Sequence, residues 1–158
     1  TDHPVVPLRN TIANLNLEQV GRTDGDVPKG AVSLTGFNYT DMAALFNAVS
    51  VQAGLKITEN PVANKYFAAS DNYNFARYGV PANTLTSAFE FPDYHGGKDE
   101  WTKIDYDSLS RITRLSGAVL WLLADRREPL HWNTKEPKTK KYREAADALY
   151  HPAPKASL

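Results

Sequence analysis

The stretch from Gly79 to Thr86 constrains the fold of this chain more than any other feature. It reads Gly-Val-Pro-Ala-Asn-Thr-Leu-Thr and predicts a short buried strand entered through a Gly/Pro turn. Residues 31–37 form a similar apolar stretch and predict a second strand. Both stretches are apolar enough to need cover on both faces. This indicates that the fold either continues in another chain or is completed by association.

Further elements follow from hydrophobic spacing and from capping residues. They suggest an α/β arrangement in which three strands are visible. The other expected elements are a strand over 11–20, a helix over 41–53 capped by Thr40 or Asn38, irregular chain over 55–69, a short helix over 71–78, and a long helix over 106–125 capped by Asp105.

The segment after the long helix has a different composition. Residues 126–158 hold eight basic and four acidic side chains and several prolines. This composition favours a solvated, partly mobile basic tail with one possible short helix at about 139–149.

Composition limits the classes of function. The length of 158 residues fits one domain, and 18 basic against 18 acidic side chains give no net charge to attract nucleic acid or an anionic membrane. The absence of cysteine excludes disulfides, thiolate metal sites and cysteine nucleophiles. No apolar run approaches the roughly twenty residues of a membrane span. Partners must therefore be inferred from individual sites.

Several common catalytic motifs are missing from the sequence. It contains no G-x-S-x-G, no Gly-rich phosphate loop, no H-E-x-x-H and no Cys/His finger. Serine hydrolase, nucleotide hydrolase, zincin and zinc-finger functions therefore lack their core elements.

The best candidate site involves His95, which lies in a glycine-containing loop just after the 79–86 strand. In open α/β sheets, ligands bind outside the carboxyl ends of the strands. Glu18 ends a neighbouring predicted strand, and imidazole together with carboxylate is a ligand set that hydrolytic metals use. The alternatives are an ordinary loop histidine and an exposed strand-end carboxylate. Ser70 and Asp71 similarly fit either a helix N-cap or a functional role.

Three motifs in the same order resemble the carboxyl-terminal half of the M28 family of zinc-dependent aminopeptidases. The resemblance spans about residues 4–125. The motifs are Leu-Asn-Leu-Glu-Gln-Val-Gly-Arg at 15–22, Ser-Asp-Asn-Tyr-Asn-Phe-Ala-Arg-Tyr-Gly-Val-Pro-Ala at 70–82, and Asp-Tyr-His at 93–95 with Asp99 and Lys-Ile-Asp at 103–105.

The resemblance implies a fold and a set of roles. It implies part of an α/β/α sandwich with a mixed sheet, the phosphorylase/hydrolase-like zinc exopeptidase fold, over 1–125, followed by the basic tail 126–158. Two zinc ions occupy the complete family site. Glu18 is similar to the fourth metal ligand and His95 to the last. Tyr94 matches a residue that donates to the oxyanion in some relatives, and Asp71 matches an acidic position near the substrate pocket.

The chain also departs from the family pattern. No histidine is followed two residues later by Asp, and no Glu-Glu pair occurs, so the bridging carboxylate and the general base of the family are missing. Asn72 stands where relatives often have His, and Glu18 where many have Asp. We therefore expect the carboxyl-terminal portion of an aminopeptidase that is inactive alone. Its implied partners are a peptide substrate and either a missing amino-terminal half or a second copy.

Two other functions remain open. One is a non-catalytic module that binds a peptide or partner by adding a strand to a sheet edge. The other is a relative of the glutaminyl cyclases, which use one zinc in a similar fold. The family resemblance favours secretion or a periplasmic location. The peptidase hypothesis requires that Glu18 and His95 converge on a common point.

Overall fold

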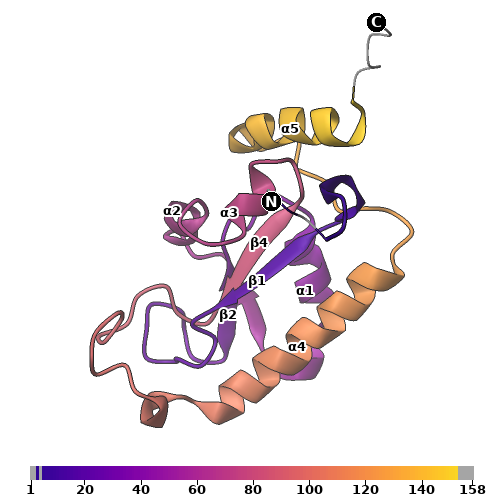
Figure 1. The fold of residues 1–158 in the computed structure, drawn as a ribbon. Coiled ribbons are helices and arrows are strands. Elements are labelled where there is room, and N and C mark those ends of the chain that lie inside the picture. The colour runs from indigo at the N-terminus through magenta and orange to yellow at the C-terminus, as the bar shows by residue number, and fades with distance from the viewer. Residues whose placement is uncertain (1–2, 4, 153–158) are drawn as a thin grey trace, which may run out of the picture.

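A mixed four-stranded sheet forms the centre of the protein (Figure 1). The structure is a computed structural model and describes residue 3 and residues 5–152. The strands run in the order β1-β4-β2-β3. β1 is parallel to β4, β2 is parallel to β3, and β2 is antiparallel to β4. The bounds are Asn14–Glu18 for β1, Ala31–Leu34 for β2, Lys56–Thr58 for β3 and Ala82–Thr86 for β4. The predicted α/β fold with a mixed sheet is confirmed.

The described residues form five α-helices around the sheet and beyond one of its ends (Figure 1). Their bounds are Met42–Ser50 for α1, Ala63–Tyr66 for α2, Tyr73–Ala76 for α3, Tyr106–Asp125 for α4 and Lys140–Tyr150 for α5. The Asp105 side chain accepts a hydrogen bond from the Ser108 backbone, which confirms the predicted N-cap of α4. Thr40 Oγ1 likewise accepts from the Met42 backbone at the start of α1. None of the helices that the structure describes is long and apolar enough to cross a membrane.

The central strands are covered on both faces as predicted, but helices of this chain supply the cover, and not the association that the sequence suggested. Every residue of β2 and β4 is buried. One face of the sheet packs on α1 and α4 through Leu85, Phe46 and Ile112, which belong to a single apolar cluster. Ala82, on the other face of β4, packs with Ala76 of α3 in a second cluster. The alternation of side chains along a strand explains this division. The result is helix, sheet and helix in three layers (Figure 1).

The expectation of irregular chain over 55–69 is wrong. This segment contains β3 and α2. β3 has three residues, so it is too short to show a period-2 pattern, and among the described strands it pairs only with β2. α2 has four residues and no side-chain cap. Both elements are held by tertiary contacts rather than by local sequence preference.

The expectation of a solvated tail is also wrong for residues 126–152. The Trp132 and Tyr142 side chains are 6% and 4% exposed, and their rings stack with centroids 4.8 Å apart. Trp132 Nε1 donates a hydrogen bond of 2.8 Å to the Gly79 carbonyl. Two large aromatic side chains can bury enough apolar surface to hold a segment that is otherwise basic. The predicted short helix corresponds to α5, and residues 153–158 lie outside the described part.

Candidate functional site

The candidate site lies at the carboxyl ends of the parallel strands β1 and β4, where Glu18 is paired with Thr86 in the sheet register. Glu18 is half-buried. Its Oε1 accepts a hydrogen bond from Asn16 Nδ2 at 2.7 Å, and its Oε2 accepts one from the Ser70 hydroxyl at 3.3 Å. Two neutral donors therefore orient this carboxylate.

A chain of neutral side chains lies behind Glu18. Asn16 Nδ2 also donates to Thr84 Oγ1 at 3.1 Å, and the Thr84 hydroxyl donates to Asn72 Oδ1 at 2.8 Å. Asn72 is fully buried and donates to the Phe67 carbonyl. Among the residues that the structure describes, Glu18 forms no ion pair. Its charge is therefore free to face a cation.

Ser70 and Asp71 do not cap α3. That helix begins at Tyr73 and has no side-chain cap hydrogen bond. The Ser70 hydroxyl instead lies 3.3 Å from both Glu18 Oε2 and the Tyr66 carbonyl. The N-cap alternative is thus wrong for Ser70, which supports the carboxylate of Glu18. The Asp71 side chain is exposed.

Two adjoining hollows are lined by three of the predicted residues, Glu18, Tyr94 and His95. Glu18 and Tyr94 line a hollow of about 140 Å³, and His95 and Tyr94 line a second one of about 480 Å³. Gln19 and Tyr94 belong to both. Glu18 and His95 therefore lie at the same end of the sheet, but they line different hollows, so the structure does not bring them to the common point that the peptidase hypothesis requires. Asp71 lines neither hollow, although its neighbour Ser70 lines the smaller one.

The backbone is unusual at this site. Gln19 has φ 47° and His95 has φ 57°, and these are the two non-glycine residues with positive φ in the described part of the chain. Left-handed backbone is uncommon for such residues and concentrates at functional sites. The rings of Tyr94 and His95 lie with centroids 4.0 Å apart. The surrounding structure must therefore hold the backbone of Gln19 and His95 in this left-handed conformation.

Arg22 supplies that support. Its side chain is buried, and its Nη1 lies 2.7 Å from Asp99 Oδ1 while its Nε and Nη2 contact both oxygens of Asp24. The guanidinium also lies 4.2 Å from the centre of the Phe91 ring. Since Phe91 and Asp99 flank His95, Arg22 ties both ends of the histidine loop to the end of β1. Sequence reasoning placed Arg22 in a motif but assigned it no role.

Charge pairing changes the pKa values around Arg22. Hydrogen bonds from Arg22 lower the pKa of the Asp24 carboxyl, and the Lys103 ammonium, paired with Asp93, lowers the pKa of the Asp93 carboxyl. The backbone N–H of Ser108 lowers the pKa of Asp105.

These lowered pKa values predict acid sensitivity. Asp24, Asp93 and Asp105 have folded-state pKa values below the ordinary 3.8, so the unfolded chain binds more protons as the pH falls through that value. We expect their contribution to the free energy of unfolding to be complete above about pH 5 and to be lost below about pH 4. Urea unfolding between pH 6 and pH 2.5 measures it. A free energy of unfolding that rises between pH 4 and pH 3 would contradict this assignment.

Two stacked aromatic rings beside Glu18 were not predicted from the sequence. Tyr66 and Phe89 line the smaller hollow and stack with centroids 5.5 Å apart. The Tyr66 phenol donates to Glu90, and this hydrogen bond raises the pKa of Tyr66 to about 12. Tyr66 and Glu90 are 24 positions apart, so no local sequence pattern predicts that they meet. Because its pKa is raised, the Tyr66 phenol is protonated at neutral pH and acts as a hydrogen-bond donor.

Glu18 and His95 provide part of the ligand set that a metal ion needs. Carboxylate and imidazole are suitable zinc ligands, and Glu18 is already oriented by its hydrogen bonds. Within residues 3 and 5–152, however, no group of three or more His, Cys, Asp or Glu side chains is placed to hold a metal ion. A complete zinc site would need ligands beyond those two.

Comparison with known proteins decides the family. The family model described as Peptidase family M28 matches residues 1–120. The chain belongs to peptidase family M28. This is a family of metallopeptidases whose members are generally zinc-dependent. The match ends within α4, so α5 and the segment leading to it lie outside the matched residues. Searches of curated proteins and of solved structures found no significant match.

Proposed function

We propose that this M28 chain is the carboxyl-terminal part of a zinc-dependent aminopeptidase, which hydrolyses the amino-terminal peptide bond of a peptide. The observation that supports this most is the placement of Glu18, Tyr94 and His95 around two hollows with a shared wall. They lie at the carboxyl ends of parallel strands, where α/β folds bind ligands.

Each residue has a defined role in this proposal. Glu18 and His95 would each supply a zinc ligand, and Tyr94, next to His95, would donate a hydrogen bond to the oxyanion that forms at the scissile carbonyl. Asp71 would approach a substrate only from outside the two hollows, because its side chain lines neither of them. Arg22 is a positioning residue, because it holds the loop that carries His95. A zinc ion bound here would polarise the carbonyl and supply a hydroxide near neutral pH.

The proposal requires groups from elsewhere. The described residues offer two of the ligands, and the sequence has neither the His-x-Asp nor the Glu-Glu motif of the family. We infer that another polypeptide segment supplies the bridging carboxylate and the general base, and that the isolated chain is inactive. Secretion or a periplasmic location belongs to the same proposal.

The decisive experiment compares the isolated chain with the complete gene product. We expect the complete product to release p-nitroaniline from leucine p-nitroanilide in the presence of zinc and the 158-residue chain to be inert. In the complete product, Glu18→Gln and His95→Asn should each lower kcat/KM by about 100-fold, because each removes a metal donor without changing side-chain size much.

Glu128→Gln is the matched control, since Glu128 is exposed and lies far along the chain from the site. It should retain full activity. A complete product with the family's other ligands but no peptidase activity would refute the proposal, as would an E18Q variant as active as the unsubstituted enzyme.

A second candidate is a non-catalytic module that binds a peptide along β1. Within the described residues β1 pairs with β4 alone, and the side chain of Leu17 on β1 is 44% exposed. A free edge can accept an added strand. Hydrogen-exchange protection of β1 by peptides, in a complete product that lacks peptidase activity, would favour this function.

A further inference from the structure

The outer face of α4 is exposed and carries a large aromatic side chain. α4 lies along the outside of the molecule (Figure 1) and buries Ile112, Leu115 and Val119 against the sheet. Trp121 and Leu120 lie outside this buried stripe and are 75% and 53% exposed. Tryptophan is among the residue types that most often supply the binding energy of a protein interface.

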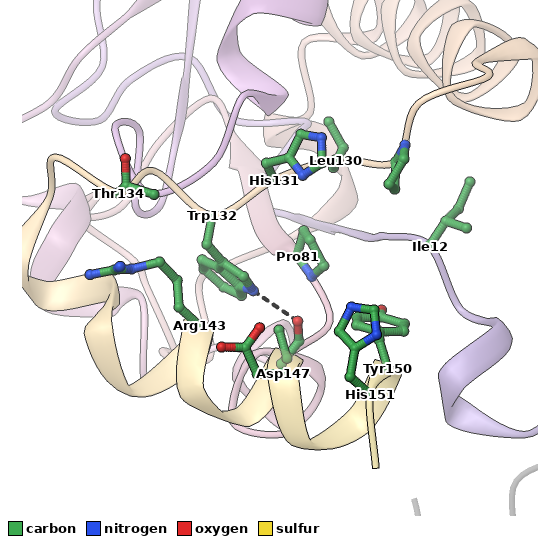
Figure 2. A pocket seen from close by; sticks show the side chains of 13 residues that line it. Ile12, Pro81, Leu130, His131, Trp132, Thr134, Arg143, Asp147, Tyr150 and His151 are labelled. Carbon is green, nitrogen blue, oxygen red and sulfur yellow. Dashed lines mark hydrogen bonds between the residues drawn. The ribbon is translucent and has the colours of Figure 1, made fainter. Parts of the chain in front are cut away.

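The exposure of Trp121 contrasts with the environment of Trp132. Trp132 is 6% exposed, lines a cavity of about 670 Å³ beside α5, and donates a hydrogen bond of 2.8 Å from its Nε1 to the Gly79 carbonyl (Figure 2). Trp121 belongs to no apolar cluster of the described residues, and its ring has no aromatic or cationic side chain on it there. Both faces of its ring are therefore available to a partner.

The charges of α4 form a pattern that complements itself. Asp107 lies near the start of the helix, Arg111 and Arg114 lie in its middle, and Asp125 ends it. All four side chains are exposed, and none forms an ion pair with another described residue. The helix dipole disfavours an acid in the last turn, and the last turn of α4 holds no basic side chain. A cation from a partner would therefore stabilise Asp125.

A second copy of the chain supplies that cation if two α4 helices pack antiparallel about a two-fold axis. When the axis passes between Gly117 and Ala118, Arg114 and Trp121 each lie about 5 Å from it along the helix, in opposite directions. Antiparallel packing therefore places Arg114 beside the partner's Trp121 in a cation–π contact, and the symmetry makes this contact twice.

The same register pairs the remaining charges. Arg111 and Asp125 lie about 10 and 11 Å from the axis, so Arg111 faces the partner's Asp125. Parallel packing would instead bring Arg114 against the partner's Arg114, and like charges repel. The charges of α4 therefore favour the antiparallel arrangement.

The centre of this contact allows close approach. Gly117 and Ala118 have small side chains on the exposed face, and a Cβ atom at Gly117 would meet no atom of the described chain within 4 Å. Two helices can therefore approach to about 8 Å, the short end of the usual range. From these features we propose that the outer face of α4 is a dimer interface, bound by the same face of a second copy of this chain. One helix pair buries less area than a standard interface, so the dimer is weak and reversible.

Sedimentation equilibrium of the 158-residue chain over a range of concentrations tests this interface. We expect a reversible dimer with a dissociation constant below about 100 μM. Trp121→Ser should raise that constant by about 100-fold or more, because the two-fold axis removes the indole from both copies. Trp101→Ser is the matched control: Trp101 is 73% exposed but precedes α4, so its substitution should leave the dissociation constant unchanged.

An exchange of charges tests the antiparallel register. Arg111→Asp and Asp125→Arg should each weaken the dimer by about tenfold, because each brings two like charges together. The variant with both substitutions should regain most of the lost affinity, since opposite charges face each other again. Circular dichroism spectra confirm that each variant is folded.

Three results would overturn the proposal: a chain that stays monomeric at every concentration, a Trp121→Ser variant that dimerises as tightly as the unsubstituted chain, or a double charge exchange that recovers no affinity. A monomeric complete gene product in which hydroxyl-radical footprinting finds Trp121 protected would also overturn it, since another segment of the polypeptide would then cover α4. None of these measurements depends on peptidase activity.

Discussion

Gly79→Ala is expected to destabilise the protein by about 4 kcal/mol. A Cβ atom at this position would lie 2.2 Å from the nitrogen and 2.4 Å from the Cα atom of Ala146 in α5. These are backbone atoms that cannot turn aside, so α5 must move. The residue also has φ 93°, which L side chains rarely adopt. Displacement of α5 exposes Tyr142 and disrupts the packing of Trp132.

Thermal unfolding followed by circular dichroism measures this effect, and a loss of 4 kcal/mol corresponds to a decrease in Tm of about 10 °C. Gly54→Ala is the matched control. Gly54 also has a positive φ, 67°, but a Cβ atom there would meet nothing within 4 Å. Its cost should stay near 1 kcal/mol. Equal costs for the two variants would show that backbone conformation, and not the contact with α5, makes Gly79 necessary.

Arg22→Met is expected to cost about 3 kcal/mol and to release the loop that carries His95. Methionine keeps an apolar stem against Phe91 but removes the charge that Asp24 and Asp99 share. Breaking one partner of a buried pair costs about 3–5 kcal/mol, and the partial exposure of these two carboxylates places the value at the lower end. Urea unfolding gives the stability, and hydrogen exchange over residues 93–99 reports on the loop.

Two further measurements separate this effect from a general loss of packing. Arg77→Met removes an exposed arginine that lies 4.9 Å from the Tyr78 ring, and it should cost less than 1 kcal/mol. Arg22→Met should also flatten the acid dependence of unfolding, because the pKa of Asp24 is no longer lowered. An unchanged exchange rate in the loop would contradict the positioning role of Arg22.

Much of the site could be foreseen because its parts carry local signals. His95 follows a strand and precedes glycines, and Glu18 ends a strand, so both could be assigned to one end of a parallel sheet before any coordinates. The hydrogen bond between Ser70 and Glu18 could not be foreseen, because the two residues are 52 positions apart in the sequence. The contact between Arg22 and Asp99 spans 77 positions and likewise has no local pattern.

The prediction of a solvated tail failed because two aromatic side chains in it are buried. Residues 126–152 have the composition of a solvated segment, and only the docking of Trp132 and Tyr142 on the sheet reverses that expectation. A composition averages over side chains, whereas burial depends on where two particular rings meet the rest of the fold.

The sequence by itself determined the buried central strands, the long capped helix α4 and membership of the M28 family. These depend on apolar spacing, capping and motifs, which are properties of neighbouring residues. Only the tertiary structure decided that Arg22 holds the histidine loop, that Ser70 supports Glu18 and that α5 closes over Gly79. Each of these depends on a contact between segments far apart in the chain, and such a contact exists only once the sheet has brought the segments together.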